Sequence, residues 1–171
     1  MTQTTDIKPA VTPYVLARDE GDHFHFFNHL ATVKVSSAEV ESMGAVEFLA
    51  PNGFGPPLHS HEDEDELIMV LDGEIIFRVG EIETVVAGGG CAFLPHGIPH
   101  TFQVRTEEAR FVAITASATG KPRFDDFVTD LGTPIATSDL PEDQPIDPAH
   151  VSEIGLRHNI TILGPPPAMK S

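Results

Sequence analysis

The chain has 171 residues, of which 26 are acidic and 10 are basic, giving a formal net charge of −16. This length favours a single domain with a substantial core. So strong a negative charge repels phosphate backbones and anionic lipids, which argues against nucleic-acid and membrane partners. Cys91 is the one cysteine, so an intrachain disulfide is excluded. A polar N-terminus without a signal-peptide pattern and a lone thiol lead us to expect a cytoplasmic protein.

Short apolar segments separated by turn residues follow a loose, polar arm of about residues 1–20. Runs of this kind, with several Gly and Pro between them, predict an antiparallel sandwich or barrel. The Asp72-Gly73 pair predicts a two-residue hairpin, and Gly80-Glu81 predicts a second one. The expected strands are Asp22–Phe27, Ala31–Ser37, Gly44–Leu49, Glu66–Leu71, Glu74–Val79, Ile82–Val86, Cys91–Leu94, His100–Arg105 and Arg110–Thr115.

The pattern becomes helical after Gly120. Apolar residues at i, i+3, i+4 and i+7 predict a helix from Phe124 to Leu131. Residues 132–146 are rich in Pro, Ser and Asp and predict a surface loop. Asp147 followed by Pro148 is typical of a helix start, and a last short strand is expected at 160–163. We expect one domain over 1–171, with the barrel at about 30–117 and a helical extension at about 118–171.

One stretch carries the chemistry. In an extended segment His59 and His61 point to the same face, so both imidazoles can bind one metal ion. Glu66 follows after a short acidic turn, and His100 lies near the start of a later strand. Three histidines and a carboxylate suit a divalent ion such as Ni, Co, Fe, Mn, Cu or Zn. The sequence does not name the metal.

These residues resemble the two motifs of the cupin superfamily. The first motif is matched by Gly53, the His59/His61 pair, Glu66 and Gly73 at the family's spacing. The second is matched by Gly89, Pro95, Gly97 and His100, with Val104 in place of the family's final Asn. The resemblance implies an all-β, antiparallel cupin β-barrel of the jelly-roll type with short C-terminal helices. It also implies one metal held by His59, His61, Glu66 and His100.

A narrower resemblance, to the single-cupin quercetinase-like group, extends into the C-terminal segment. Its features here are Leu30–Val35, Asp147-Pro148, Ile154–His158 and Ile162–Pro166. It implies a metal-dependent dioxygenase that opens the heterocycle of a flavonol with O2 and releases CO. Its partners would be a small aromatic substrate and O2. Glu66 would then be a metal ligand, the general base for the substrate hydroxyl, or both. The residues expected near the substrate are Phe54, Leu58, Met69, Phe77, Phe93, Phe102 and Phe111.

Other interpretations stay open at this point. A non-oxidative cupin enzyme (a polyketide cyclase or an isomerase) and a non-catalytic ligand-binding cupin are the alternatives. We expect a homodimer, because the Phe-rich segment 22–30 has little to cover it in a small barrel. The acidic run 62–66 is interpreted as a solvated turn with only Glu66 facing inward, and Cys91 as a core residue. His23 and His25 could share a strand face and bind a metal, but we interpret them as an exposed or dimer-facing pair. The sequence assigns no role to His29, the third histidine of this group.

Overall fold

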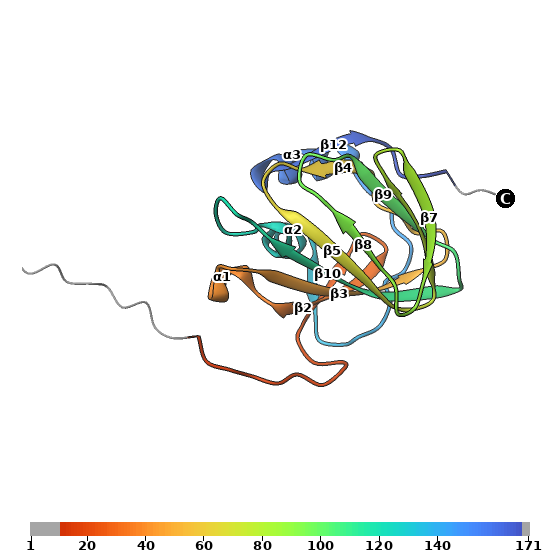
Figure 1. Cartoon of the computed structure of the whole chain (residues 1–171). Coiled ribbons are helices and arrows are strands. Elements are labelled where there is room, and N and C mark those ends of the chain that lie inside the picture. Colours follow the sequence, from red (N-terminus) through yellow and green to blue (C-terminus); the bar gives the residue numbers. More distant parts are fainter. Residues whose placement is uncertain (1–10, 169–171) are drawn as a thin grey trace, which may run out of the picture.

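The computed structural model describes residues 11–168, which fold into two facing antiparallel sheets with helices α2 and α3 at one end (Figure 1). This arrangement confirms the predicted all-β jelly roll. In spatial order, the larger sheet consists of β11 (Thr133–Ile135), β1 (Asp22–Phe26), β2 (His29–Val35), β3 (Gly44–Pro51), β10 (Glu108–Ala116), β5 (Asp65–Asp72) and β8 (Cys91–Leu94). The smaller sheet consists of β12 (Ile160–Gly164), β4 (Leu58–His61), β9 (His100–Val104), β6 (Glu74–Val79) and β7 (Ile82–Ala87). The helices are α1 (Ser37–Val40), α2 (Phe124–Leu131) and α3 (Pro148–Arg157).

Alternation along the central strands places the core between the sheets. In β5, Ile68 and Val70 are buried while Met69 and Leu71 are exposed. Glu66 has the same parity as Ile68, so it also points into the interior. The pleat of β5 therefore turns one carboxylate inward among apolar side chains.

The predicted Asp72-Gly73 hairpin is wrong, whereas the Gly80-Glu81 hairpin is confirmed. Strand β5 pairs with β10 and β8, and β6 pairs with β9 and β7, so Asp72-Gly73 carries the chain from one sheet to the other. Only Gly73 of that pair has a positive φ, of 82°. A Cβ at Gly73 would lie 2.6 Å from the Glu108 carbonyl oxygen, so the corner requires glycine.

The C-terminal segment packs against the sheets. Helix α2 is confirmed, and α3 begins as predicted, with the Asp147 side chain accepting a hydrogen bond from the Ala149 N–H. Strand β12 pairs with β4, which carries two of the motif histidines. Residues 132–146 contain the short strand β11, which sequence analysis did not predict. Residues 11–20 are exposed, and the rest of the predicted arm lies outside the described residues. No helix within 11–168 has the length and apolar character needed to cross a membrane.

The Phe-rich segment of β1 is covered by the chain itself. Phe26 is buried and makes an edge-to-face contact of 5.6 Å with Phe127 of α2. Phe24 and Phe27 are half-buried against the same core. The expectation that these rings lack cover is therefore wrong, because α2 and the following loop supply it.

Candidate metal centre

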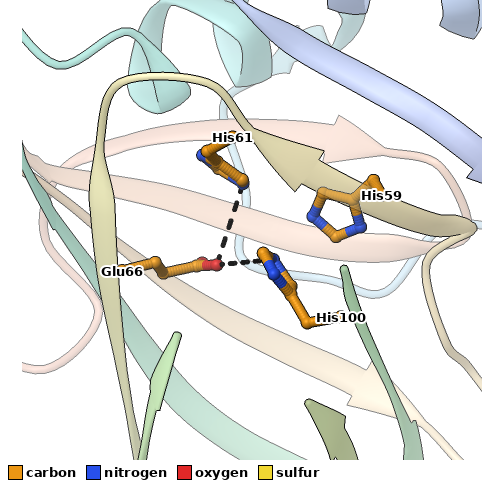
Figure 2. A group of neighbouring side chains, drawn as sticks. All are labelled: His59, His61, Glu66 and His100. Carbon is orange, nitrogen blue, oxygen red and sulfur yellow. Dashed lines mark ion pairs between the residues drawn. The ribbon is translucent and has the colours of Figure 1, made fainter. Parts of the chain in front are cut away.

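Three strands bring the four motif side chains together. His59 and His61 come from β4, Glu66 from β5 and His100 from β9. His59 and His100 are direct partners in the β4–β9 register. One ligand atom from each of the four residues lies within 4.8 Å of all the others (Figure 2). Residues far apart in the sequence thus converge where the two sheets face each other.

The donor atoms face one another inside the protein. The Glu66 Oε2 atom lies 3.8 Å from His61 Nε2 and 3.5 Å from His100 Nε2. All four side chains are buried. Such a cluster is costly without a partner for its polar atoms, because each would lose its hydrogen bonds to water.

Each histidine is anchored through the ring nitrogen that faces away from the cluster. His59 Nδ1 lies 2.8 Å from the Pro57 carbonyl oxygen, and His100 Nδ1 lies 2.9 Å from that of Ile98. His61 Nδ1 lies 2.8 Å from Glu64 Oε1. Because these oxygens accept, each Nδ1 carries the proton and each Nε2 keeps a lone pair. This arrangement fixes the tautomer that metal-binding histidines need.

The orphaned nitrogens test whether a metal fits. Among the described residues, His61 Nε2 and His100 Nε2 have no hydrogen-bond partner, although both are buried. Three imidazole nitrogens and one carboxylate oxygen form a donor set typical of borderline divalent ions. The site therefore fits a divalent transition metal held by His59, His61, Glu66 and His100.

Glu64 is a site residue that the sequence interpretation missed. It was placed in a solvated turn, but its side chain is 2% exposed. Its Oε1 accepts from His61, and its Oε2 accepts from the backbone N–H groups of Arg123 (2.9 Å) and Phe124 (3.4 Å). These N–H groups open helix α2, whose positive end favours a carboxylate. These contacts hold the Glu64 side chain inside the protein. The sequence of the acidic run alone cannot show this, because the partners lie in another segment of the chain.

Burial and the neighbouring charges shift the pKa values of the buried metal-binding side chains in different directions. Burial lowers the pKa of His59 well below its ordinary value, and the imidazoles of His100 and His61 add to this effect. Burial also opposes protonation of His61, but its contact with Glu64 and the charge of Glu66 raise its pKa. Burial alone would favour the protonated form of Glu66, yet the adjacent His100 and His61 lower its pKa. Glu66 is thus held as a carboxylate.

The group opens into an apolar cavity with a free volume of about 50 Å³. His59, Glu66 and His100 form one part of its wall, and Glu66 is the only acidic residue that lines it within the described chain. A space of this size holds a few water molecules. The remaining lining residues are Phe26, Phe27, His29, Phe48, Phe54, Pro56, Pro57, Ile68, Phe102, Phe111, Ala113, Phe124, Phe127, Val151, Ile160 and Ile162.

The expected substrate-contacting residues divide into three groups. Phe54, Phe102 and Phe111 line the cavity. Phe77 is buried and Leu58 half-buried, but neither reaches the cavity. Met69 and Phe93 are exposed at 39% and 59%, so their assignment to the pocket is wrong. Both lie on the outer face of the β5–β8 edge, because the strand pleat turns them away from the core. Cys91, also in β8, is likewise exposed rather than packed in the core.

The three histidines of the β1–β2 region, His23, His25 and His29, have different surroundings. His23 contacts Thr32 Oγ1 (2.9 Å) and the Asp19 carbonyl oxygen (3.1 Å), and His25 contacts the Asp139 carbonyl oxygen (3.0 Å). Both ring nitrogens of His23 and the Nε2 atom of His25 thus contact oxygen atoms of the chain itself. His29 differs, since it is buried and lines the cavity. The sequence alone assigned no role to His29, and the structure places it in the cavity wall.

Known proteins show the same domain. Residues 45–115 match the cupin domain family. A segment of 104 residues is 30% identical to quercetin 2,3-dioxygenase of Bacillus subtilis, covering 60% of this chain and 31% of that protein. The chain thus spans about a third of that relative's length. The structure is similar to a predicted oxalate decarboxylase from Thermotoga maritima, with a TM-score of 0.55 and 18% identity over 61% of this chain and 99% of the other. It is also similar to the Cnp3 cupin domain of Schizosaccharomyces pombe, with a TM-score of 0.50 and 17% identity over 62% and 74%.

Proposed function

Because this chain belongs to the cupin superfamily, we propose that it is a metal-dependent dioxygenase that opens a flavonol or a related polyphenol with O2. The main observation behind the proposal is that a polar metal-binding group and an apolar, mostly aromatic surface line the same cavity. Three members of the buried metal-binding group, His59, Glu66 and His100, form one wall of a cavity whose other walls are almost entirely aromatic and aliphatic. A flat, hydroxylated aromatic molecule matches both surfaces. The similarity to a quercetin dioxygenase supports the same substrate class.

The roles of the polar residues follow from their anchoring. His59, His61 and His100 would hold the metal through Nε2, because their Nδ1 contacts fix the ring orientations. When bound, a divalent metal supplies a Lewis-acidic centre that makes a substrate hydroxyl more acidic. Three histidines are enough to hold such an ion, which leaves the Glu66 carboxylate available for proton transfer.

Glu66 acts as the general base. Its carboxylate is ionised, is buried and lines the cavity, so it can accept the proton of a flavonol 3-hydroxyl placed beside it. The apolar walls exclude water, which keeps the transferred proton on the carboxylate rather than in bulk solvent. Phe54, Phe102 and Phe111 hold the aromatic rings of the substrate.

A second apolar hollow of about 430 Å³ adjoins the cavity, and we propose that the substrate enters through it. The two spaces share six lining residues, so displacement of these side chains joins them into one pocket large enough for a polyphenol. Phe27, which lines both spaces, has a φ of 53°, in the left-handed region that costs a residue other than glycine roughly 1–2 kcal/mol. The shared residues are Phe27, Phe54, Pro56, Pro57, Val151 and Ile162.

We propose that two copies associate through the outer face of the β5–β8 edge. Met69, Leu71 and Phe93 are exposed there at 39%, 49% and 59%, and an apolar edge of this kind is typical of an interface. Light scattering should show a dimer at micromolar concentration and a monomer for Phe93→Asp. A monomeric wild type would contradict the proposal.

The exposed thiol of Cys91 suits a reducing cytoplasm, where we place the protein.

Oxygen uptake with quercetin tests the activity directly. Protein reconstituted separately with each candidate ion should consume O2 only when quercetin is present, and quercetin should disappear at the same rate. Quercetin conversion without O2 would identify a non-oxidative cupin enzyme instead. Tight quercetin binding with no conversion under air would identify a ligand-binding cupin.

A further inference from the structure

His29 occupies an unusual place for a histidine. It begins β2 and has the same parity as Ala31 and Val33, which point into the core. It therefore points between the sheets, where it is 2% exposed and lines the same cavity as Glu66 and His100. The two polar parts of this cavity thus come from different strands: Glu66 and His100 from β5 and β9, and His29 from β2.

Aromatic rings surround the His29 imidazole. Its centroid lies 4.0 Å from that of Phe54, 5.1 Å from Phe48 and 5.3 Å from Phe26. Within residues 11–168 the buried Nδ1 atom has no hydrogen-bond partner. An unpaired buried nitrogen costs roughly 1–3 kcal/mol. A phenylalanine would fill this space without that cost. The presence of an imidazole here therefore indicates a hydrogen-bond partner from outside the described chain.

The surroundings of His29 select the kind of partner. Burial lowers the pKa of His29 to about 3, so the ring is neutral at physiological pH. A neutral imidazole presents one donor and one acceptor. Apolar side chains surround the ring, and Glu66, at the metal group, is the one acidic side chain of the cavity wall in the described chain. The ring is therefore suited to an uncharged hydroxyl group, which both donates and accepts.

We propose that His29 hydrogen-bonds a ring hydroxyl of the substrate and so makes the site selective for polyhydroxylated aromatic molecules. This inference rests on the proposed function for the orientation of the substrate. A flavonol whose 3-hydroxyl lies at Glu66 directs the hydroxyls of another ring away from the metal group and toward the aromatic part of the cavity. His29 is then a specificity-determining residue, while Glu66 moves the proton.

Anaerobic equilibrium binding to zinc-loaded protein tests this role without turnover. The two probes are quercetin and 3-hydroxyflavone, which keeps the 3-hydroxyl but lacks the ring hydroxyls of quercetin. Wild-type protein should bind quercetin more tightly. The selectivity is the dissociation constant of 3-hydroxyflavone divided by that of quercetin. In His29→Phe this ratio should fall about tenfold, the usual effect of losing one hydrogen bond and leaving its partner unpaired. His29→Gln, which keeps a donor and an acceptor, should restore part of the ratio.

His158→Phe is the matched control. His158 is also buried and also has an unpartnered Nδ1, but its Nε2 contacts Asp130 (2.8 Å) and it does not line the cavity. This variant should lose folding stability without changing the ratio of dissociation constants. In ¹⁵N-histidine NMR spectra, quercetin should shift the ring nitrogens of His29 and leave those of His158 in place.

The outcomes separate the two proposals. An unchanged binding ratio in folded His29→Phe, or an unshifted His29 ring in quercetin-bound wild type, would overturn the role of His29 alone. A changed ratio in protein that never consumes O2 would overturn the dioxygenase and leave the recognition role standing. Failure of wild type to bind either flavonol would overturn both.

Discussion

The two polar regions of the cavity differ in how their histidines are held. At the metal group, His59, His61 and His100 each have one ring nitrogen tied to an oxygen of the protein. Near β1 and β2, His29 is packed among aromatic rings, and its Nδ1 has no partner within the described residues. Both regions are buried and line the same space. Only the first is built to hold a fixed geometry.

This difference indicates two kinds of ligand. An anchored imidazole has a set tautomer and a set direction, as a metal ion with few preferred geometries requires. An imidazole without an anchor can present either nitrogen as the donor and can rotate toward the group that arrives. This contrast agrees with the two proposed roles, a rigid centre for a metal ion and an adaptable contact for an organic hydroxyl.

The largest effect is expected at Glu66, where the proposed roles of base and ligand can be separated. Glu66→Gln should retain metal, because three anchored histidines remain, yet lose about 10²–10⁴-fold in flavonol turnover, since an amide cannot accept the hydroxyl proton. Metal content and O2 uptake should be measured on the same preparation. Full metal with near wild-type turnover would remove Glu66 from the mechanism, and loss of metal would make it mainly a ligand.

The anchoring itself is tested at Glu64. Glu64→Gln removes the charge that faces His61 and the start of α2, so metal affinity should fall about 10–100-fold. Glu62→Gln is the control, because Glu62 lies in the same acidic run but is exposed, and its carboxylate accepts a hydrogen bond from the Thr161 hydroxyl rather than from a histidine of the metal group. Competition with a chromogenic chelator measures both affinities. Equal affinities in the two variants would show that the Glu64 contact does not tune the site.

Acid stability sharpens the contrast at His29. Its ordinary pKa of 6.5 is lowered to about 3 in the folded protein. Below about pH 6.5 the His29 side chain is protonated in the unfolded chain but stays neutral in the folded protein. The free energy of unfolding therefore falls as the pH drops from about 6.5 toward 3. In His29→Phe, the loss of unfolding free energy between about pH 7 and pH 5 should be about 2 kcal/mol smaller.

Urea titrations of chelator-treated wild type and variant measure this difference. The chelator removes any contribution from metal binding, and all other titratable groups are common to both proteins. Parallel pH profiles for the two proteins would show that His29 becomes charged in the folded state, which would contradict its buried, neutral description.

Sequence patterns foresaw the site better than its surroundings. The alternation of His59 and His61 and the motif position of His100 predicted a convergence that the structure displays. These residues lie on regular strands, where parity fixes direction. Parity could not decide between the two faces of β5 and β8, however, so Met69 and Phe93 were assigned to the wrong side.

The missed features depend on contacts between distant segments. Glu64 is buried because α2, about 60 residues later, offers it two backbone N–H groups. His29 is buried because the helical extension and the aromatic core close over β1 and β2. Asp72-Gly73 looks like a hairpin locally, but the partners of β5 and β6 lie in different sheets. No local pattern encodes these long-range choices.

The central claim is that His59, His61 and His100 bind one divalent metal, and elemental analysis tests it most directly. Wild-type protein, reconstituted and freed of loosely bound ions, should carry about one metal ion per chain. The double variant His59→Ala, His61→Ala should carry almost none while retaining its β-sheet circular dichroism spectrum. Equal metal content in wild type and the double variant, or a wild type that retains no divalent ion, would contradict the account.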